Sequence, residues 1–134
     1  MLRVMLDTNI LISSLFFPSI TTFQFFSLLN NRAEVVFSEY VLAELHRISQ
    51  KKFPQKAFVV DQFLEEFPFT LVETPIKVPS EMIPHMRDAK DMPILIAAVG
   101  NHVDVLVSGD KDFLVLNLPA PRIMNMADFI KEHT

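Results

Sequence analysis

The chain contains no cysteine, which excludes a disulfide framework and a zinc site built on thiolates. It also has only two glycines in 134 residues. Phosphate-binding loops of nucleotide-binding proteins need several closely spaced glycines, because the backbone must approach the phosphates. The P-loop and the dinucleotide-binding fingerprint are therefore both excluded.

Long apolar runs are also missing from the sequence. None approaches the roughly 20 residues that a transmembrane helix requires. The N-terminal segment reaches an acid, Asp7, before it could form the hydrophobic core of a secretion signal. We therefore expect a single domain over residues 1–134, located in the cytoplasm and without a membrane partner.

Positive charge is in short supply, with 12 basic against 16 acidic residues and a formal net charge of −4. A nucleic-acid-binding surface is usually basic, so the overall balance does not favour such a function. The balance matters less where the excess acid is gathered in one pocket and neutralised by a bound cation. The positions of the acidic residues along the chain therefore decide between these possibilities.

Half of the sequence is apolar, and its apolar runs alternate between two kinds. Short β-branched runs ending in polar residues predict strands at 3–6, 34–37, 70–72, 105–107 and 122–124. Longer periodic stretches predict helices at 20–30, 39–50, 56–66 and 92–101. This alternation predicts an α/β fold, a three-layer α/β/α sandwich around a parallel sheet of four to five strands. We expect the first strand to be central and adjacent to the fourth.

Acidic residues follow two of these strands, where sites form in open parallel sheets. Asp7 comes directly after the first strand, and Asp110 and Asp112 follow the fourth. Gly109 is expected to allow a tight exit from the sheet. Each acid could instead cap the helix that follows it, since Asp is a favoured N-cap residue. If the two strands are neighbours, Asp7 and Asp110 leave the sheet side by side.

Two further acids lie on predicted helices. Glu44 borders the apolar stripe of the helix at 39–50, where the alternative role is a salt bridge or a partly exposed rim position. Asp91 heads the apolar stripe of the helix at 92–101, and Pro93 requires that helix to begin close by. Asp91 is therefore also expected to be its N-cap. Asp88 is either a supporting acid of the same site or a solvated residue.

Together these four acids, Asp7, Glu44, Asp91 and Asp110, predict a cation site. Two carboxylates about 4 Å apart repel each other by about 4 kcal/mol at an effective dielectric constant near 20. Four such groups either take up protons or bind a cation, and oxygen ligands select Mg²⁺ or Mn²⁺ over zinc. The histidines form no ligand pattern and are expected at the surface: His46, His85, His102 and His133.

Four blocks, taken in order, resemble the motifs of the PIN domain, in the branch that includes VapC-like toxin ribonucleases of bacteria and archaea. They are Leu-Asp-Thr-Asn at 6–9, Ser-Glu-Tyr-Val-Leu-Ala-Glu-Leu at 38–45, Arg-Asp-Ala-Lys-Asp at 87–91 and Val-Ser-Gly-Asp-Lys-Asp-Phe at 107–113. The resemblance covers nearly the whole chain. It implies a PIN-like fold and an endoribonuclease that hydrolyses RNA phosphodiester bonds with Mg²⁺ or Mn²⁺. It also implies the toxin component of a toxin–antitoxin pair, with an antitoxin protein as partner.

The resemblance also assigns roles to individual residues. It makes Asp7, Glu44, Asp91 and Asp110 the catalytic metal ligands, with Asp112 as an additional metal-binding acid. The polar side chains that support this site would be Asn9 and Ser108. Related chains often carry a polar or acidic residue where this one has Pro93, so whether Asp88 or Asp91 is the main ligand stays open. The number of metal ions stays open as well.

Two other functions compete with this interpretation. A phosphotransferase with an aspartyl nucleophile usually needs a second acid two residues later, and that position holds Asn9. A catalytically silent interaction module on the same fold would retain the motifs without the activity. The four acids argue against such a loss of activity, and metal titration would distinguish the two cases.

Two surfaces have several interpretations. The helix at 20–30 carries more apolar side chains than one face can hold. The excess could be buried in a homodimer, under an antitoxin-like partner, or against other elements of the same domain. Basic residues near the acids are candidates for RNA binding, although solvated helix charges explain them equally well. They are Arg47, Lys51, Lys52, Lys56 and Lys111.

Overall fold

The computed structural model describes residues 1–75 and 91–134, in which strands and helices alternate. The first part contains β1 (Leu2–Leu6), α1 (Thr8–Phe16), α2 (Ile20–Arg32), β2 (Ala33–Ser38), α3 (Glu39–Lys52), α4 (Phe58–Glu66) and β3 (Thr70–Val72). The second contains α5 (Met92–Gly100), β4 (Val105–Val107), α6 (Lys111–Leu114), β5 (Arg122–Met124) and α7 (Met126–His133). Within these described ranges no helix has the length and apolar character of a membrane span.

The five strands form one sheet in the order β3-β2-β1-β4-β5, and every neighbouring pair is parallel. The strand β1 is central, and its last residue, Leu6, pairs with Val107 at the end of β4. The backbone N–H of Asp7 continues this pairing by donating to the carbonyl of Val107 at 3.2 Å. The predicted α/β class, the central first strand and its pairing with the fourth strand are therefore confirmed.

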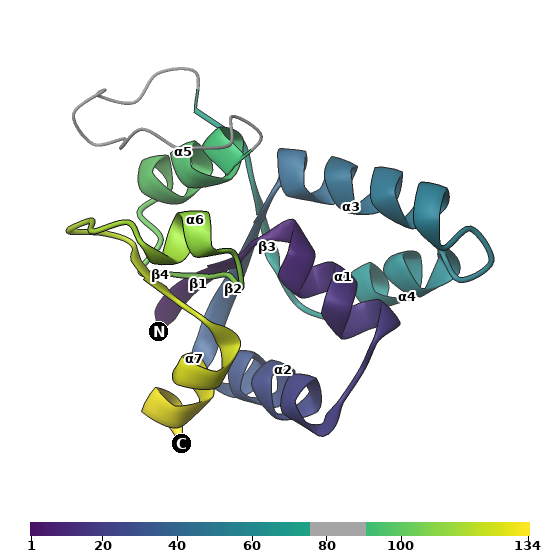
Figure 1. Cartoon of the computed structure of the whole chain (residues 1–134), viewed down its shortest axis with the longest axis horizontal. Helices are drawn as coiled ribbons and strands as arrows, with labels where there is room; N and C mark the ends of the chain where they lie inside the picture. The colour runs from purple at the N-terminus through teal and green to yellow at the C-terminus, as the bar shows by residue number, and fades with distance from the viewer. Residues whose placement is uncertain (76–90) are drawn as a thin grey trace.

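Helices cover both faces of this sheet, as Figure 1 shows. The helices α2 and α7 contact each other on one side, where the rings of Phe25 and Phe129 meet edge to face at 5.4 Å. The helices α3 and α5 contact each other on the other side. Burial on both faces explains why β1 and β4 are almost continuously apolar instead of alternating. The predicted three-layer sandwich is confirmed.

The helix boundaries follow local capping interactions. The side chain of Ser38 accepts a hydrogen bond from the backbone N–H of Val41 at 3.2 Å, which confirms it as the N-cap of α3. The helices α1, α6 and α7 were not among the four predicted from periodicity, although capping by Asp7 and Asp110 was considered as the alternative role of these two acids. Gly109 was expected to allow a tight exit from the sheet, but neither glycine has a positive φ. The exit from β4 therefore does not depend on glycine's conformational freedom.

Candidate metal centre

Asp7 stands at the carboxyl end of the central strand and is almost fully buried, with 2% of its surface exposed. Its Oδ1 accepts a hydrogen bond from the backbone N–H of Ile10 at 2.9 Å and so caps α1. Its Oδ2 accepts a hydrogen bond from the hydroxyl of Ser108. The capping role considered from the sequence is therefore real, and it fixes the carboxylate at the edge of the sheet.

Ser108 links the two strand ends that carry the acids. It directly follows β4 and is fully buried. Its hydroxyl donates to Asp7 and accepts a hydrogen bond from the backbone N–H of Asp110 at 3.0 Å. The predicted support by Ser108 thus has a geometric basis, since one hydroxyl sets the positions of two acids from neighbouring strands.

Asp110 continues this arrangement into α6. Its Oδ1 accepts a hydrogen bond from the backbone N–H of Asp112 at 2.9 Å, which makes Asp110 the N-cap of the helix. This turn folds Asp112 back toward Asp110. Carboxylate oxygens of Asp91, Asp110 and Asp112 all lie within 4.8 Å of one another, and all three residues are partly buried. Asp112, which the resemblance made only an additional metal-binding acid, therefore belongs to the most compact group of the site.

Asp91 brings the third carboxylate of this group from a different element. It occupies the N-cap position of α5, but its side chain makes no capping hydrogen bond, so the expected cap role is wrong. The φ and ψ of Asp91, −85° and −14°, already lie in the helical region, whereas a capping residue is usually extended. The position of Asp91 thus directs its carboxylate to the acid group without tying it to the helix backbone.

Glu44 lies on the neighbouring helix α3, beside the buried Val41 and Leu45 as the sequence predicted. Its side chain is 16% exposed. Its Oε2 accepts a hydrogen bond from the Tyr40 hydroxyl at 3.3 Å and lies 3.8 Å from the Arg47 guanidinium. The salt bridge considered as an alternative role is therefore present, although Arg47 is largely exposed and the contact is long.

The acids influence one another electrostatically. The pKa of Asp7 is raised above its ordinary value of 3.8, first of all because burial disfavours the charged form. The hydrogen bonds from Ser108 and Ile10 oppose this rise in pKa, whereas the charges of Asp110 and Glu44 add to it. Asp7 and Glu44 are thus within electrostatic range of each other and of the compact group.

This raised pKa predicts a pH dependence of stability for the metal-free protein. Between the ordinary pKa and the raised one, the folded state binds more protons than the unfolded state, so the free energy of unfolding rises as the pH falls. Asp7→Asn keeps an oxygen that can cap α1 but carries no charge. We expect the variant to be more stable than wild type at neutral pH, with a difference that shrinks as the pH approaches 4.

Urea denaturation between pH 4 and pH 8, without metal, measures this difference. Glu65→Gln, on the exposed side of α4, controls for the loss of one negative charge. Two results would refute the electrostatic account of Asp7. One is an Asp7→Asn protein that is less stable than wild type at neutral pH, and the other is a difference in free energy of unfolding that does not change with pH.

The donor set at the sheet edge fits a hard divalent cation. All the side chains are carboxylates, and the 4.8 Å spread of the compact group lets one ion contact several oxygens directly or through water. No cysteine is present, and none of the described histidines joins the group. Mg²⁺ and Mn²⁺ prefer such all-oxygen surroundings, whereas zinc prefers nitrogen and sulfur ligands.

The remaining predicted residues are less closely connected with the acids. Asn9 is exposed on the first turn of α1, and no hydrogen bond joins its side chain to the acids in the described part of the chain. Lys51, Lys52, Lys56 and Lys111 are exposed. Asp88 and His85 lie outside the described residues. His133 is not a simple surface residue, because its ring packs on Phe129 at 4.3 Å.

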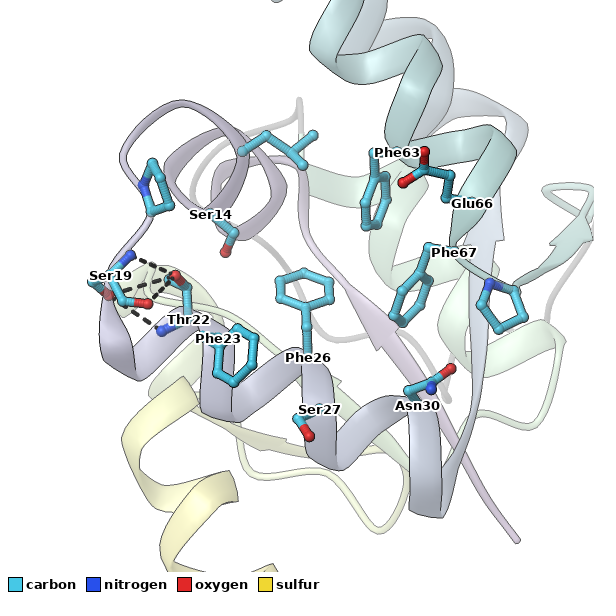
Figure 2. Close-up of a pocket in the computed structure, with 13 residues that line it drawn as sticks. Ser14, Ser19, Thr22, Phe23, Phe26, Ser27, Asn30, Phe63, Glu66 and Phe67 are labelled. Carbon is cyan, nitrogen blue, oxygen red and sulfur yellow. Dashed lines mark hydrogen bonds between the residues drawn. The ribbon is translucent and has the colours of Figure 1, made fainter.

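A second feature is a groove between α1, α2 and α4, with a volume of about 550 Å³ (Figure 2). Four phenylalanines line it, namely Phe23, Phe26, Phe63 and Phe67. The ring of Phe26 meets those of Phe63 and Phe67 edge to face, at 5.7 and 5.5 Å. Phe23 lines the groove and is 76% exposed. The other lining residues are Ser14, Leu15, Pro18, Ser19, Thr22, Ser27, Asn30, Glu66 and Pro68.

The α1–α2–α4 groove accounts for part of the apolar excess of the helix at 20–30. Phe25 and Leu29 are fully buried in the core of the domain, whereas Ile20 and Phe23 are 80% and 76% exposed. One face of the helix therefore packs into the core of the domain, and another face leaves apolar side chains exposed. The sequence indicated this excess but could not indicate that α4 supplies the opposite wall.

Comparison with known proteins adds a family and two solved structures. The sequence model of the PIN domain family matches residues 3–112. The fold is similar to a chain in the VapBC2 complex of Rickettsia felis bound to a promoter DNA fragment, with a TM-score of 0.72, 21% identity and coverage of 92% of this chain and 98% of that one. It is also similar to a chain in the DNA-bound VapBC complex of Salmonella typhimurium, with a TM-score of 0.70, 22% identity and coverage of 94% and 99%. At these identities the structural likeness shows the fold.

None of the curated proteins matches the sequence.

Proposed function

Because the chain belongs to the PIN domain family, we propose that it is an endoribonuclease that hydrolyses RNA phosphodiester bonds with Mg²⁺ or Mn²⁺. The observation that carries this proposal is the gathering of carboxylates from the end of β1, from α3, from the start of α5 and from the start of α6 at the carboxyl edge of the sheet. We place the activity in the cytoplasm, where RNA is available.

The residues have distinct parts in this proposal. Asp91, Asp110 and Asp112 would hold the cation, and Asp7 and Glu44 would complete its surroundings directly or through water. When bound, a divalent ion supplies Lewis acidity toward the phosphodiester and activates water for attack. Ser108 keeps Asp7 and Asp110 in register, so that the site is largely formed before the substrate arrives.

The substrate needs room and positive charge beside the acids. A Cβ added at Gly109 would meet no heavy atom of the described residues within 4 Å, so space is open next to Asp110. We assign phosphate binding to the exposed Lys111 in α6 and to Arg47 in α3. Lys51 and Lys52 extend this basic surface along α3, although they also lie in its last turn, where cations favour the helix dipole.

A catalytically silent module on the same fold is the second possibility. A silent scaffold needs only an uncharged cap for α1 at this position, which asparagine would supply. A charged Asp7 within range of two other negative charges raises the free energy of the folded state. A bound cation would offset that electrostatic cost. The geometry therefore favours a working metal site over a catalytically silent module.

Cleavage of a single-stranded RNA with and without divalent ions tests the proposal. We expect cleavage with Mn²⁺ or Mg²⁺, none in EDTA, and recovery when the ion is returned in excess. A DNA oligonucleotide of the same sequence tests the preference for RNA. Cleavage that persists undiminished in EDTA would contradict a metal-dependent enzyme, and the absence of cleavage with a bound ion would favour the silent module.

We further propose that the protein is the toxin of a toxin–antitoxin pair, with an apolar segment of the antitoxin in the α1–α2–α4 groove. The similar folds come from VapBC complexes, and the groove offers an aromatic wall with the exposed Phe23 at its opening. An apolar groove with exposed apolar side chains beside it is a feature typical of protein interaction sites. A homodimer through the same surface is the alternative occupant.

Replacing Phe23 by Glu tests this interface with little risk to the fold, because the side chain is already exposed. Where the neighbouring gene encodes a small DNA-binding protein, that protein is purified separately and titrated into this one by calorimetry. We expect at least tenfold weaker binding for Phe23→Glu and little change for Phe58→Glu, which is 64% exposed but outside the groove. Unchanged affinity of Phe23→Glu would exclude the groove, and a loss of self-association alone would indicate the homodimer.

A further inference from the structure

One helix face carries a short array of polar side chains around Glu44. Tyr40 lies one turn before Glu44 in α3, and Arg47 lies one turn after it, so both can reach the same carboxylate. The Tyr40 hydroxyl donates to Oε2 of Glu44 at 3.3 Å. The Arg47 guanidinium approaches the same oxygen at 3.8 Å. Both neighbours therefore engage Oε2, and among the described residues neither a hydrogen bond nor an ion pair uses Oε1.

The two neighbours of Glu44 differ in how firmly they can hold it. Arg47 has 63% of its side chain exposed, so its attraction to Glu44 is screened by solvent. Tyr40 is only partly exposed, packs against the hydrophobic core and donates a directional hydrogen bond. Its rigid ring loses little conformational entropy when it makes this contact, whereas the long arginine side chain loses more. Tyr40 is therefore the better anchor.

Glu44 needs such an anchor because it lies among like charges. Its negative charge contributes to raising the pKa of Asp7, so the two carboxylates repel each other. A flexible glutamate can relieve this repulsion by turning toward solvent. The Tyr40 hydroxyl is within electrostatic range of both Glu44 and Asp91, so it lies near the compact group as well as near the α3 acid.

We infer that Tyr40 is a positioning residue, whose hydroxyl holds Oε2 of Glu44 and thereby presents Oε1 to the divalent cation. This inference rests on the proposed function, since it assumes that the acids bind a cation. It assigns Tyr40 a role that the four sequence motifs did not reveal. The hydroxyl acts through Glu44 and needs no contact with the RNA.

The test compares Tyr40→Phe with wild type, because this change removes the hydroxyl and keeps the ring. Mn²⁺ binding to the full chain is measured by electron paramagnetic resonance, beside thermal melting without metal and RNA cleavage at several Mn²⁺ concentrations. Groups that hydrogen-bond a metal ligand typically change metal affinity by about 10- to 100-fold. We therefore expect the Mn²⁺ dissociation constant of Tyr40→Phe to rise about tenfold or more, with a melting temperature close to that of wild type.

High Mn²⁺ should restore most of the cleavage rate of Tyr40→Phe, because its carboxylates remain intact. Glu44→Gln should not be rescued in this way, and Arg47→Gln should change the affinity less than Tyr40→Phe. If wild type binds Mn²⁺ and Tyr40→Phe binds it equally well, the positioning role is overturned while the proposed function stands. If wild type itself binds no Mn²⁺, the proposed function and this inference both fail.

Discussion

Asp110→Asn is expected to abolish Mn²⁺ binding and to reduce RNA cleavage by orders of magnitude, while the fold remains intact. Asp110 has two roles in the structure, as the cap of α6 and as a member of the compact acid group. Asparagine is nearly as good a cap as aspartate, so it can still accept the hydrogen bond from the backbone of Asp112. The substitution therefore removes the charge and leaves the turn in place.

Asp128→Asn is the matched control for this prediction. Asp128 is an exposed acid in the first turn of α7, so its replacement removes the same charge near a helix N-terminus but outside the acid group. Both variants are assayed for RNA cleavage in Mn²⁺ and for melting with and without the ion. If Asp110→Asn cleaves RNA as fast as Asp128→Asn, Asp110 is not part of the active site.

Asp91→Asn is expected to leave the metal-free protein as stable as wild type, or more stable, and to eliminate its stabilisation by Mn²⁺. The side chain makes no capping hydrogen bond, so asparagine loses no cap. Removing its charge relieves repulsion within the group it forms with Asp110 and Asp112. An ion at 100 times its dissociation constant stabilises a folded protein by about 2.7 kcal/mol, and this gain should disappear.

Thermal melting with increasing Mn²⁺, beside an RNA-cleavage assay, measures both parts of this prediction. Wild type should melt at higher temperature as Mn²⁺ increases, and Asp91→Asn should not respond. Cleavage by the variant should fall by orders of magnitude. A variant that is stabilised by Mn²⁺ as much as wild type and still cuts RNA would show that Asp91 is not part of the metal centre.

Much of the fold could be predicted because it depends on features that are local in sequence. The five strands are short apolar runs, and the alternation with helices defines a parallel sheet. The PIN domain family predicted from four motifs is confirmed by the family match over residues 3–112, and the resemblance to VapC-like proteins agrees with the two VapBC structures. The placement of Asp7 and Asp110 on neighbouring strand ends followed from the same reasoning.

The parts that the sequence did not reveal depend on side-chain direction and on packing between distant elements. Asp112 joins the compact group because Asp110 caps α6 and so holds the first turn of that helix beside its own carboxylate. Asp91 is not a cap because its own backbone is already helical, which residue type alone does not disclose. Tyr40 reaches Glu44 only because both point along the same side of α3. A tyrosine four residues before a glutamate has no distinctive signal in a single sequence.

The central claim is that the acids at the sheet edge form a working divalent-cation site. Calorimetric titration of Mn²⁺ into the metal-free protein, with Mg²⁺ as competitor, tests it most directly. We expect saturable binding in wild type, competition by Mg²⁺, and loss of binding when Asp91 and Asp110 are both replaced by asparagine. Binding that is absent in wild type, or equal in wild type and the double variant, would contradict the account.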